Sequence, residues 1–161
     1  MALGDNTLRS AAGNSQRGRN PFMVQTTLNW ATALSDKGGA LAAADVIPVI
    51  AVPKGTMILN AGIEVDTATD GSTFTVDLGT GVDPDVFVDG FDATSAAAVV
   101  AQNPAAYQPV MAVADDNIDV TIATLSGGAV TSGKFRVWAV LMDCTDMGDT
   151  AADEVARDAL A

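Results

Sequence analysis

The chain has 161 residues, of which 48% are hydrophobic and 5% aromatic, with 20 acidic and 8 basic residues, one cysteine and no histidine. A formal charge of −12 excludes general binding to nucleic acid, because so acidic a protein repels the phosphate backbone. The absence of histidine excludes imidazole-based catalytic triads and the usual zinc sites, and a single cysteine excludes an intrachain disulfide.

The first twenty residues differ in character from the rest of the chain. They are rich in Gly, Asn, Ser, Gln and Arg and lack hydrophobic periodicity, so they cannot bury enough surface to fold alone. Arg9, Arg17 and Arg19 are set against one aspartate, which gives residues 1–20 a net charge of +2 and leaves −14 on residues 21–161. We predict an extended N-terminal arm that pairs with acidic groups of a protein partner.

The sequence contains no apolar stretch of the kind that directs or anchors proteins to membranes. The N-terminus lacks the apolar region of a signal peptide, and no run of about eighteen apolar residues occurs. We therefore expect synthesis in the cytoplasm of a host cell and no membrane partner.

From Pro21 the chain changes to short runs of Val, Ile, Thr and Phe separated by Gly, Pro, Asp and Asn, which is typical of an all-β domain. We assign this domain to residues 21–146. Eight strands are predicted, at Phe22–Trp30, Val46–Val52, Met57–Thr67, Thr73–Leu78, Val86–Val88, Tyr107–Ala114, Ile118–Thr124 and Phe135–Met142.

Alternation of apolar and polar residues predicts which face of each strand is buried. In the last predicted strand, the apolar face comprises Phe135, Val137, Ala139 and Leu141. Its second face begins with charged residues and turns apolar halfway, at Trp138, Val140 and Met142. This second face is therefore expected to meet another sheet or another subunit.

The connections indicate how the strands are joined. Asp70-Gly71 favours a tight hairpin between the strands at Met57–Thr67 and Thr73–Leu78, because both residue types tolerate positive φ. We expect strands that follow one another in sequence to be antiparallel neighbours. The Ala-rich stretch before Pro104 is either a helical turn or a loop.

The last residues, 147–161, form a tail with a helical pattern. Asp149 or Thr150 is a candidate N-cap, and Asp153 and Glu154 fall in the first turn, where negative charge is favourable. A helix of about a dozen residues is marginal alone, so it needs a surface on which to dock.

No group of residues has the pattern of a catalytic site. Cys144 has Asp143 and Asp146 beside it, whose negative field disfavours a reactive thiolate. A glycosidase needs two carboxylates, but the only glutamates are Glu64 in a strand and Glu154 in the tail. We therefore expect no enzymatic activity and no cofactor.

The densest acidic segment contains Asp83, Asp85, Asp89 and Asp92 within ten residues. Calcium requires several oxygen ligands, so this segment is a weak candidate for a calcium site. Its spacing does not fit the EF-hand pattern, because Phe87 stands where an alternate ligand belongs. The other interpretation is that these aspartates form turns and keep the surface soluble.

Four parts of the chain carry a resemblance to known proteins: the polar arm, the strand MVQTTLNW, the segment GTMILNAGIEVDTATDGSTFTVDLGTGVDPDVFVDG and the closing GKFRVWAVLMDCTD. Together they resemble small virion structural proteins of tailed bacteriophages, especially marine and cyanobacterial phages. The likeness covers most of residues 21–146. Its characteristic positions are Gly62, Glu64, Val65, Thr75, Val76, Asp77, Leu78, Gly79, Thr80, Gly81, Asp83, Asp89, Gly90 and Asp92.

This resemblance implies a jelly-roll-like antiparallel β-sandwich that attaches to the outer surface of a phage head as a cement or decoration protein. It further implies that the protein is a homotrimer and that its partner is the major capsid protein. We expect the arm and Phe22 to contact the capsid, and we consider Trp30, Tyr107 and Trp138 as either trimer-interface or core residues. The alternatives are a tail-fibre or receptor-binding module and a carbohydrate-binding sandwich.

Overall fold

The structure is a computed structural model that describes residues 20–71, 73–94, 100–101 and 109–144. In these ranges the chain forms nine strands and one eight-residue helix, which is too short to cross a bilayer. The elements are, in order, β1 (Phe22–Asn29), α1 (Trp30–Lys37), β2 (Val46–Val52), β3 (Thr56–Thr67), β4 (Thr73–Thr80), β5 (Val88–Asp92), β6 (Val100–Ala101), β7 (Val110–Met111), β8 (Asp116–Ser126) and β9 (Lys134–Asp143).

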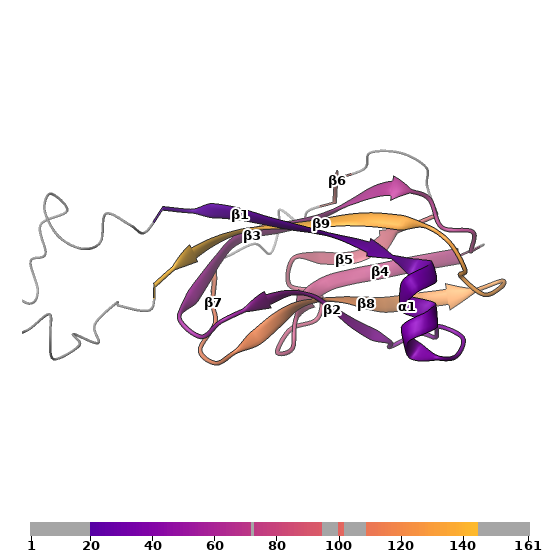
Figure 1. Ribbon diagram of the computed structural model, residues 1–161, viewed down its shortest axis with the longest axis horizontal. Coiled ribbons are helices and arrows are strands. Elements are labelled where there is room, and N and C mark those ends of the chain that lie inside the picture. Colours follow the sequence, from indigo (N-terminus) through magenta and orange to yellow (C-terminus); the bar gives the residue numbers. More distant parts are fainter. Residues whose placement is uncertain (1–19, 72, 95–99, 102–108, 145–161) are drawn as a thin grey trace, which may run out of the picture.

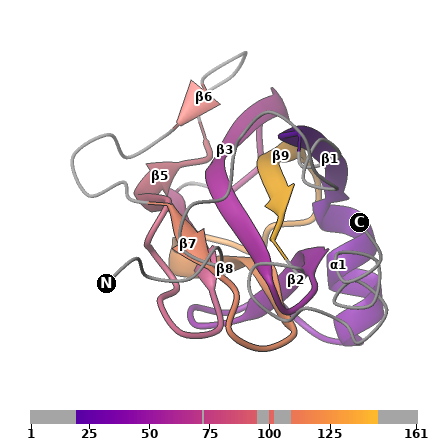
Figure 2. The same ribbon diagram turned by 90° about the vertical axis from the view of Figure 1, so that its left-hand side faces the viewer.

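The strands form two antiparallel sheets that face each other as a sandwich (Figures 1 and 2). Sheet A has the order β1-β9-β3, with the short strands β6 and β7 both paired to the far edge of β3. Sheet B has the order β2-β8-β4-β5. This architecture confirms the predicted all-β, jelly-roll-like antiparallel sandwich.

The core lies between the sheets and follows the predicted alternation. Phe135, Val137, Ala139 and Leu141 of β9 are all buried, as are the matching residues of the central strands of sheet B, namely Phe74, Val76, Leu78, Ile118, Val120 and Ile122. Full burial of one such side chain contributes about 1.5–3 kcal/mol, so these alternating positions largely hold the two sheets together.

Helix α1 was not predicted, and it shortens the first predicted strand by one residue. The Asn29 side chain accepts a hydrogen bond from the Ala31 backbone N–H at 3.0 Å and so caps the helix. Gly38 ends the helix in the left-handed conformation, with φ of 68°. The cap turns the chain at Trp30, whose side chain enters the core.

The predicted hairpin at Asp70-Gly71 is wrong. Strand β3 belongs to sheet A and β4 to sheet B, so the segment between them crosses from one sheet to the other. Asp70 fastens this crossing to the segment before β9, because its carboxylate accepts hydrogen bonds from the backbone N–H groups of Thr131 and Ser132 and from the Thr131 hydroxyl.

The expectation that consecutive strands pair is likewise wrong for most of the fold. Among the strands that the structure describes, only β4 and β5 are both consecutive in sequence and hydrogen-bonded to each other. The chain instead alternates between sheets, as it must in a sandwich with long-range strand pairing. As a result, both ends of the described body, the start of β1 and the end of β9, lie together at one end of the sandwich (Figure 1).

Candidate assembly surfaces

The outer face of sheet A carries rows of apolar side chains across its strands. The strand register places Met111, Met57 and Met142 side by side on β7, β3 and β9. The next row pairs Met23 of β1 with Val140 of β9. Residues paired directly across antiparallel strands point to the same face, so each row is continuous. The Val140 row ends on β3 at a polar residue, Asn60.

Trp138 forms the following row, between Gln25 of β1 and Gly62 of β3. Gly62 has no side chain to compete with the indole for space. We call these side chains the methionine face: Met23, Met57, Met111, Trp138, Val140 and Met142. Met23 is 63% exposed and Met111 37%, and the other four side chains are half-buried.

Charged groups begin beyond Trp138, at the end of sheet A away from the two chain ends. Arg136 of β9 lies opposite Glu64 of β3, and its guanidinium donates a hydrogen bond to the Glu64 carboxylate at 2.8 Å. This ion pair bounds the methionine face on one side.

The outer face of sheet B has the opposite character, because aspartates occupy its centre. Asp77 of β4 and Asp119 of β8 alternate with core residues and therefore point outward. Burial raises the pKa of each carboxyl, and the negative charges of Asp89 and Asp85 raise that of Asp77 further, as Asp116 does for Asp119. Sheet B thus presents an acidic surface whose carboxyls disfavour one another's charge.

A third surface is the end of the sandwich at which β1 begins and β9 ends. Phe22, Val82 and Val113 expose 47%, 88% and 79% of their side chains there, and we call this surface the apolar end. Between the sheets it opens into a groove of about 470 Å³. Its wall is mostly apolar and includes Val52, Ile58, Val82, Val110, Met111, Ala112 and Val113, and it also includes the polar residues Asp115, Asp116 and Asn117. Large apolar side chains that remain exposed together mark interaction sites more often than single ones do.

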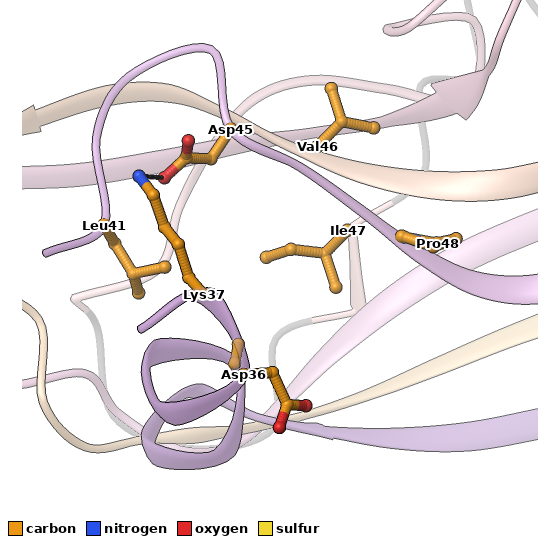
Figure 3. Close-up of a pocket in the computed structure, with 8 residues that line it drawn as sticks. Asp36, Lys37, Leu41, Asp45, Val46, Ile47 and Pro48 are labelled. Carbon is orange, nitrogen blue, oxygen red and sulfur yellow. Dashed lines mark hydrogen bonds and ion pairs between the residues drawn. The ribbon is translucent and has the colours of Figure 1, made fainter. Parts of the chain in front are cut away.

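A smaller pocket of about 440 Å³ lies at the opposite end, between α1 and β2 (Figure 3). Leu41, Ile47 and Pro48 form its apolar wall. The Lys37 ammonium forms an ion pair with Asp45 at 2.5 Å, and this bond lowers the pKa of the Asp45 carboxyl. The lysine therefore ties the last turn of α1 to the segment that leads into β2.

The structure does not gather the four calcium candidates into one site. Asp83 and Asp85 share a hydrogen bond, which raises the pKa of Asp83. Asp89 lies near Asp77, whereas Asp92 accepts hydrogen bonds from the Thr94 hydroxyl and backbone N–H at 2.6 and 2.9 Å. Among the residues that the structure describes, no three acidic or cysteine side chains are arranged to hold a metal ion.

The sequence-predicted contact residues are found in different environments. Phe22 is exposed at the apolar end, and Trp138 lies half-buried on the methionine face. Trp30 is a core residue, since its side chain has no exposed surface and its ring packs edge-on against Phe74 and Phe135, with centroids 4.8 and 5.2 Å apart. The remaining predicted contacts lie outside the described residues: Arg9, Arg17, Arg19 and Tyr107.

The apolar half of the second face of β9 was predictable from the sequence, whereas the methionine rows and the apolar end were not predicted. The sequence shows the methionines of these rows only as single residues on separate strands. The strand register is needed to see that they lie side by side. Val82 and Val113 each follow a strand within a polar segment, and nothing in the local pattern indicates that the two segments meet.

Comparison with solved structures places this fold among known ones. The chain superposes on a chain of the cyanophage Pam1 capsid asymmetric unit with a TM-score of 0.61 and 17% identity, covering 88% of this chain and 98% of that one. Its fold is that of a chain in a phage capsid. A chain of the Ralstonia phage GP4 capsid matches with a TM-score of 0.57 and 17% identity, over 86% of this chain and 93% of that one. No protein-family profile and no curated protein sequence matches.

Proposed function

We propose that this protein is a capsid decoration protein: a non-enzymatic cement that binds the outer surface of a tailed-phage head as a homotrimer and stabilises the joints between major capsid subunits. The observation that carries the proposal is the extent of the fold similarity. The likeness spans nearly the whole of two chains from phage capsids, 98% and 93% of their lengths, rather than a shared fragment.

The apolar end supports the proposal because it exposes large apolar side chains that binding to a shell would cover. The arm joins the domain at this end, at Phe22 of β1, and Val82 and Val113 are exposed at the same end. Burial of these apolar groups on a shell would supply binding free energy in proportion to the area removed from water. The basic arm would add charge-assisted contacts to acidic groups of the shell.

The mechanism of stabilisation is linkage. A protein that binds the assembled shell but not its separated subunits shifts the equilibrium towards the assembled state. Three copies held together bind with greater avidity than one, because the second and third contacts become intramolecular. The trimer is therefore part of the proposed mechanism.

The proposal is tested with shells assembled from the major capsid protein encoded in the same genome. The purified chain should sediment with these shells to a saturating ratio and raise the temperature at which they come apart. If the chain remains in the supernatant, or instead binds host cells as a receptor-binding module would, the decoration function is wrong.

A pair of variants tests whether the apolar end makes the contact. The double variant Val82→Glu/Val113→Glu should weaken shell binding by at least about tenfold, because two charges must be desolvated at the interface. Val46→Glu is the matched control, since Val46 is 56% exposed on β2, away from the apolar end. Equal loss of binding in both variants would contradict the assignment of this surface.

A further inference from the structure

We propose that the methionine face is the surface through which copies of this chain pack against one another. The inference rests on the proposed function in requiring self-association, and it goes further by assigning that association to one face of one sheet. It excludes the outer face of sheet B and the pocket beside α1.

Charge selects between the two sheet faces. Residues 21–161 carry a net charge of −14, so two copies repel each other unless they meet where acidic groups are absent. On sheet B the partners would bury Asp77 and Asp119, whose pKa values burial already raises within one copy. The methionine face contains no charged residue, so it can meet a second acidic copy without burying like charges.

The side chains of the methionine face suit a protein contact. Methionine is flexible and polarizable, so several methionines can adapt to a second surface of the same kind. Tryptophan and methionine are both enriched at the centres of protein interfaces, and Trp138 is half-buried at the margin of the methionine rows. Four of the six methionines of the chain lie on this face.

The Arg136–Glu64 pair supplies a polar rim. The two side chains expose 43% and 28% of their surface, so each remains accessible from the outer face. A second copy that packs on the methionine face with its apolar end in the same direction would place its own arginine and glutamate near the same rim. Charged pairs at the rim of an interface determine how two copies align and which partner is accepted, more than they add to the affinity.

The position of the face fits simultaneous binding to a shell. The row of Met111, Met57 and Met142 lies at the end of sheet A nearest the apolar end, where β9 finishes (Figure 1). Copies joined through this side of the sandwich can therefore present their apolar ends in a common direction. Acidic sheet B would then face outward.

The test compares molar masses by light scattering over a wide range of concentrations, for the full chain and three variants. Met23→Glu and Trp138→Gln should weaken self-association by at least about tenfold, because they place a charge or a smaller polar group in the contact. Val46→Glu adds the same charge to an exposed strand residue elsewhere and should leave the mass unchanged. Circular dichroism checks that each variant is folded.

Two results would overturn the inference. One is a folded Met23→Glu or Trp138→Gln variant with the self-association of the parent chain. The other is a monomeric parent whose methionines resist peroxide until residues 145–161 are removed, which would make the C-terminal segment the occupant of the face. A monomer that still binds shells overturns this inference and the trimer of the proposed mechanism but leaves shell binding standing, whereas an oligomer that binds no shell overturns the decoration function and leaves this inference standing.

Discussion

Trp30 is the largest side chain without any exposed surface, and it joins the helix to both sheets through Phe74 of sheet B and Phe135 of sheet A. Its removal leaves a cavity where three rings meet. Trp30→Ala should therefore lower the free energy of unfolding by about 3–5 kcal/mol, measured by denaturant titration. Phe22→Ala, which removes a half-exposed ring at the apolar end, should cost less than half as much. Similar losses for the two variants would contradict the central position of Trp30.

Two aspartates should change stability with pH in opposite directions. The folded-state pKa of Asp119 is raised above 3.8 by burial, so its favourable contribution exists below that pH and is lost as pH rises through the folded pKa. The folded-state pKa of Asp45 is lowered by its bond to Lys37, so its contribution exists above pH 3.8 and is lost as pH falls through the folded pKa.

Substitution by asparagine removes each of these titrations. Asp119→Asn should raise the melting temperature at pH 7, and Asp45→Asn should lower it, with both differences shrinking below the unfolded-state pKa near 4. Thermal unfolding from pH 3 to pH 7 measures both curves. Asp119→Asn with a lower melting temperature at pH 7 would show that the charge of this carboxylate is compensated in the fold.

At the scale of elements, the loop between β4 and β5 depends on Gly79. A Cβ atom at this position would lie 2.1 Å from the Asp83 carbonyl oxygen, and the Thr80 N–H donates a hydrogen bond to the same oxygen at 2.8 Å. Gly79→Ala must therefore displace the loop that carries Val82. We expect a loss of about 1–3 kcal/mol in unfolding free energy together with weaker shell binding.

Gly39→Ala is the control for that substitution. A Cβ atom at Gly39 meets no atom within 4 Å, and its φ is not in the positive range. Denaturant unfolding should find this variant close to the parent chain. A Gly79→Ala variant that is equally stable would mean that the loop lies farther from β4 than the structure places it.

The elements also show how far sequence reasoning extends. Strand positions were predictable because each strand buries one alternating face, as Phe74, Val76 and Leu78 do. The pairing of the strands was not predictable, because the alternation shows which face of a strand is buried but not which strand lies beside it. Both sheets bury equivalent apolar rows, so the pattern does not separate them. Asp70 shows the difficulty, since the same residue that favours a hairpin turn here receives hydrogen bonds from Thr131, 61 residues later.

The candidate surfaces were predictable only in part, for the same reason. The apolar half of the second face of β9 is visible in one strand, so Trp138 could be singled out. The row of Met57, Met111 and Met142 exists only after β3, β7 and β9 are aligned. Helix α1 is signalled by Asn29 and Gly38, but its eight residues are too few to show a helical period.

At the scale of the whole molecule, the proposed arrangement gives each surface a separate task. The apolar end meets the shell, the methionine face meets other copies, and acidic sheet B faces solvent. Met111 lies where the first two surfaces adjoin, since it belongs to the methionine face and also lines the groove. Opposite sheet faces that differ so strongly in charge favour contact between copies through sheet A and disfavour it through sheet B.

The N-terminal arm, residues 1–20, is also proposed to bind another protein, the shell. Deletion of residues 1–19, or Arg9→Glu/Arg17→Glu/Arg19→Glu, should weaken shell binding by about tenfold or more while the melting temperature stays unchanged. The deletion should also make binding less sensitive to salt, because the attraction it removes is the part that salt screens, whereas the charge reversal creates a repulsion that added salt should relieve. Sedimentation with shells at two salt concentrations measures both effects. Unchanged binding by the truncated chain would show that the arm does not contribute.

Cryo-electron microscopy of shells incubated with the purified chain tests the central claim most directly. The account predicts added density on the outer surface at fixed symmetry positions, with the start of β1 and the end of β9 directed at the shell and α1 directed away from it. A bare outer surface, or density attached through α1 or sheet B, would contradict it.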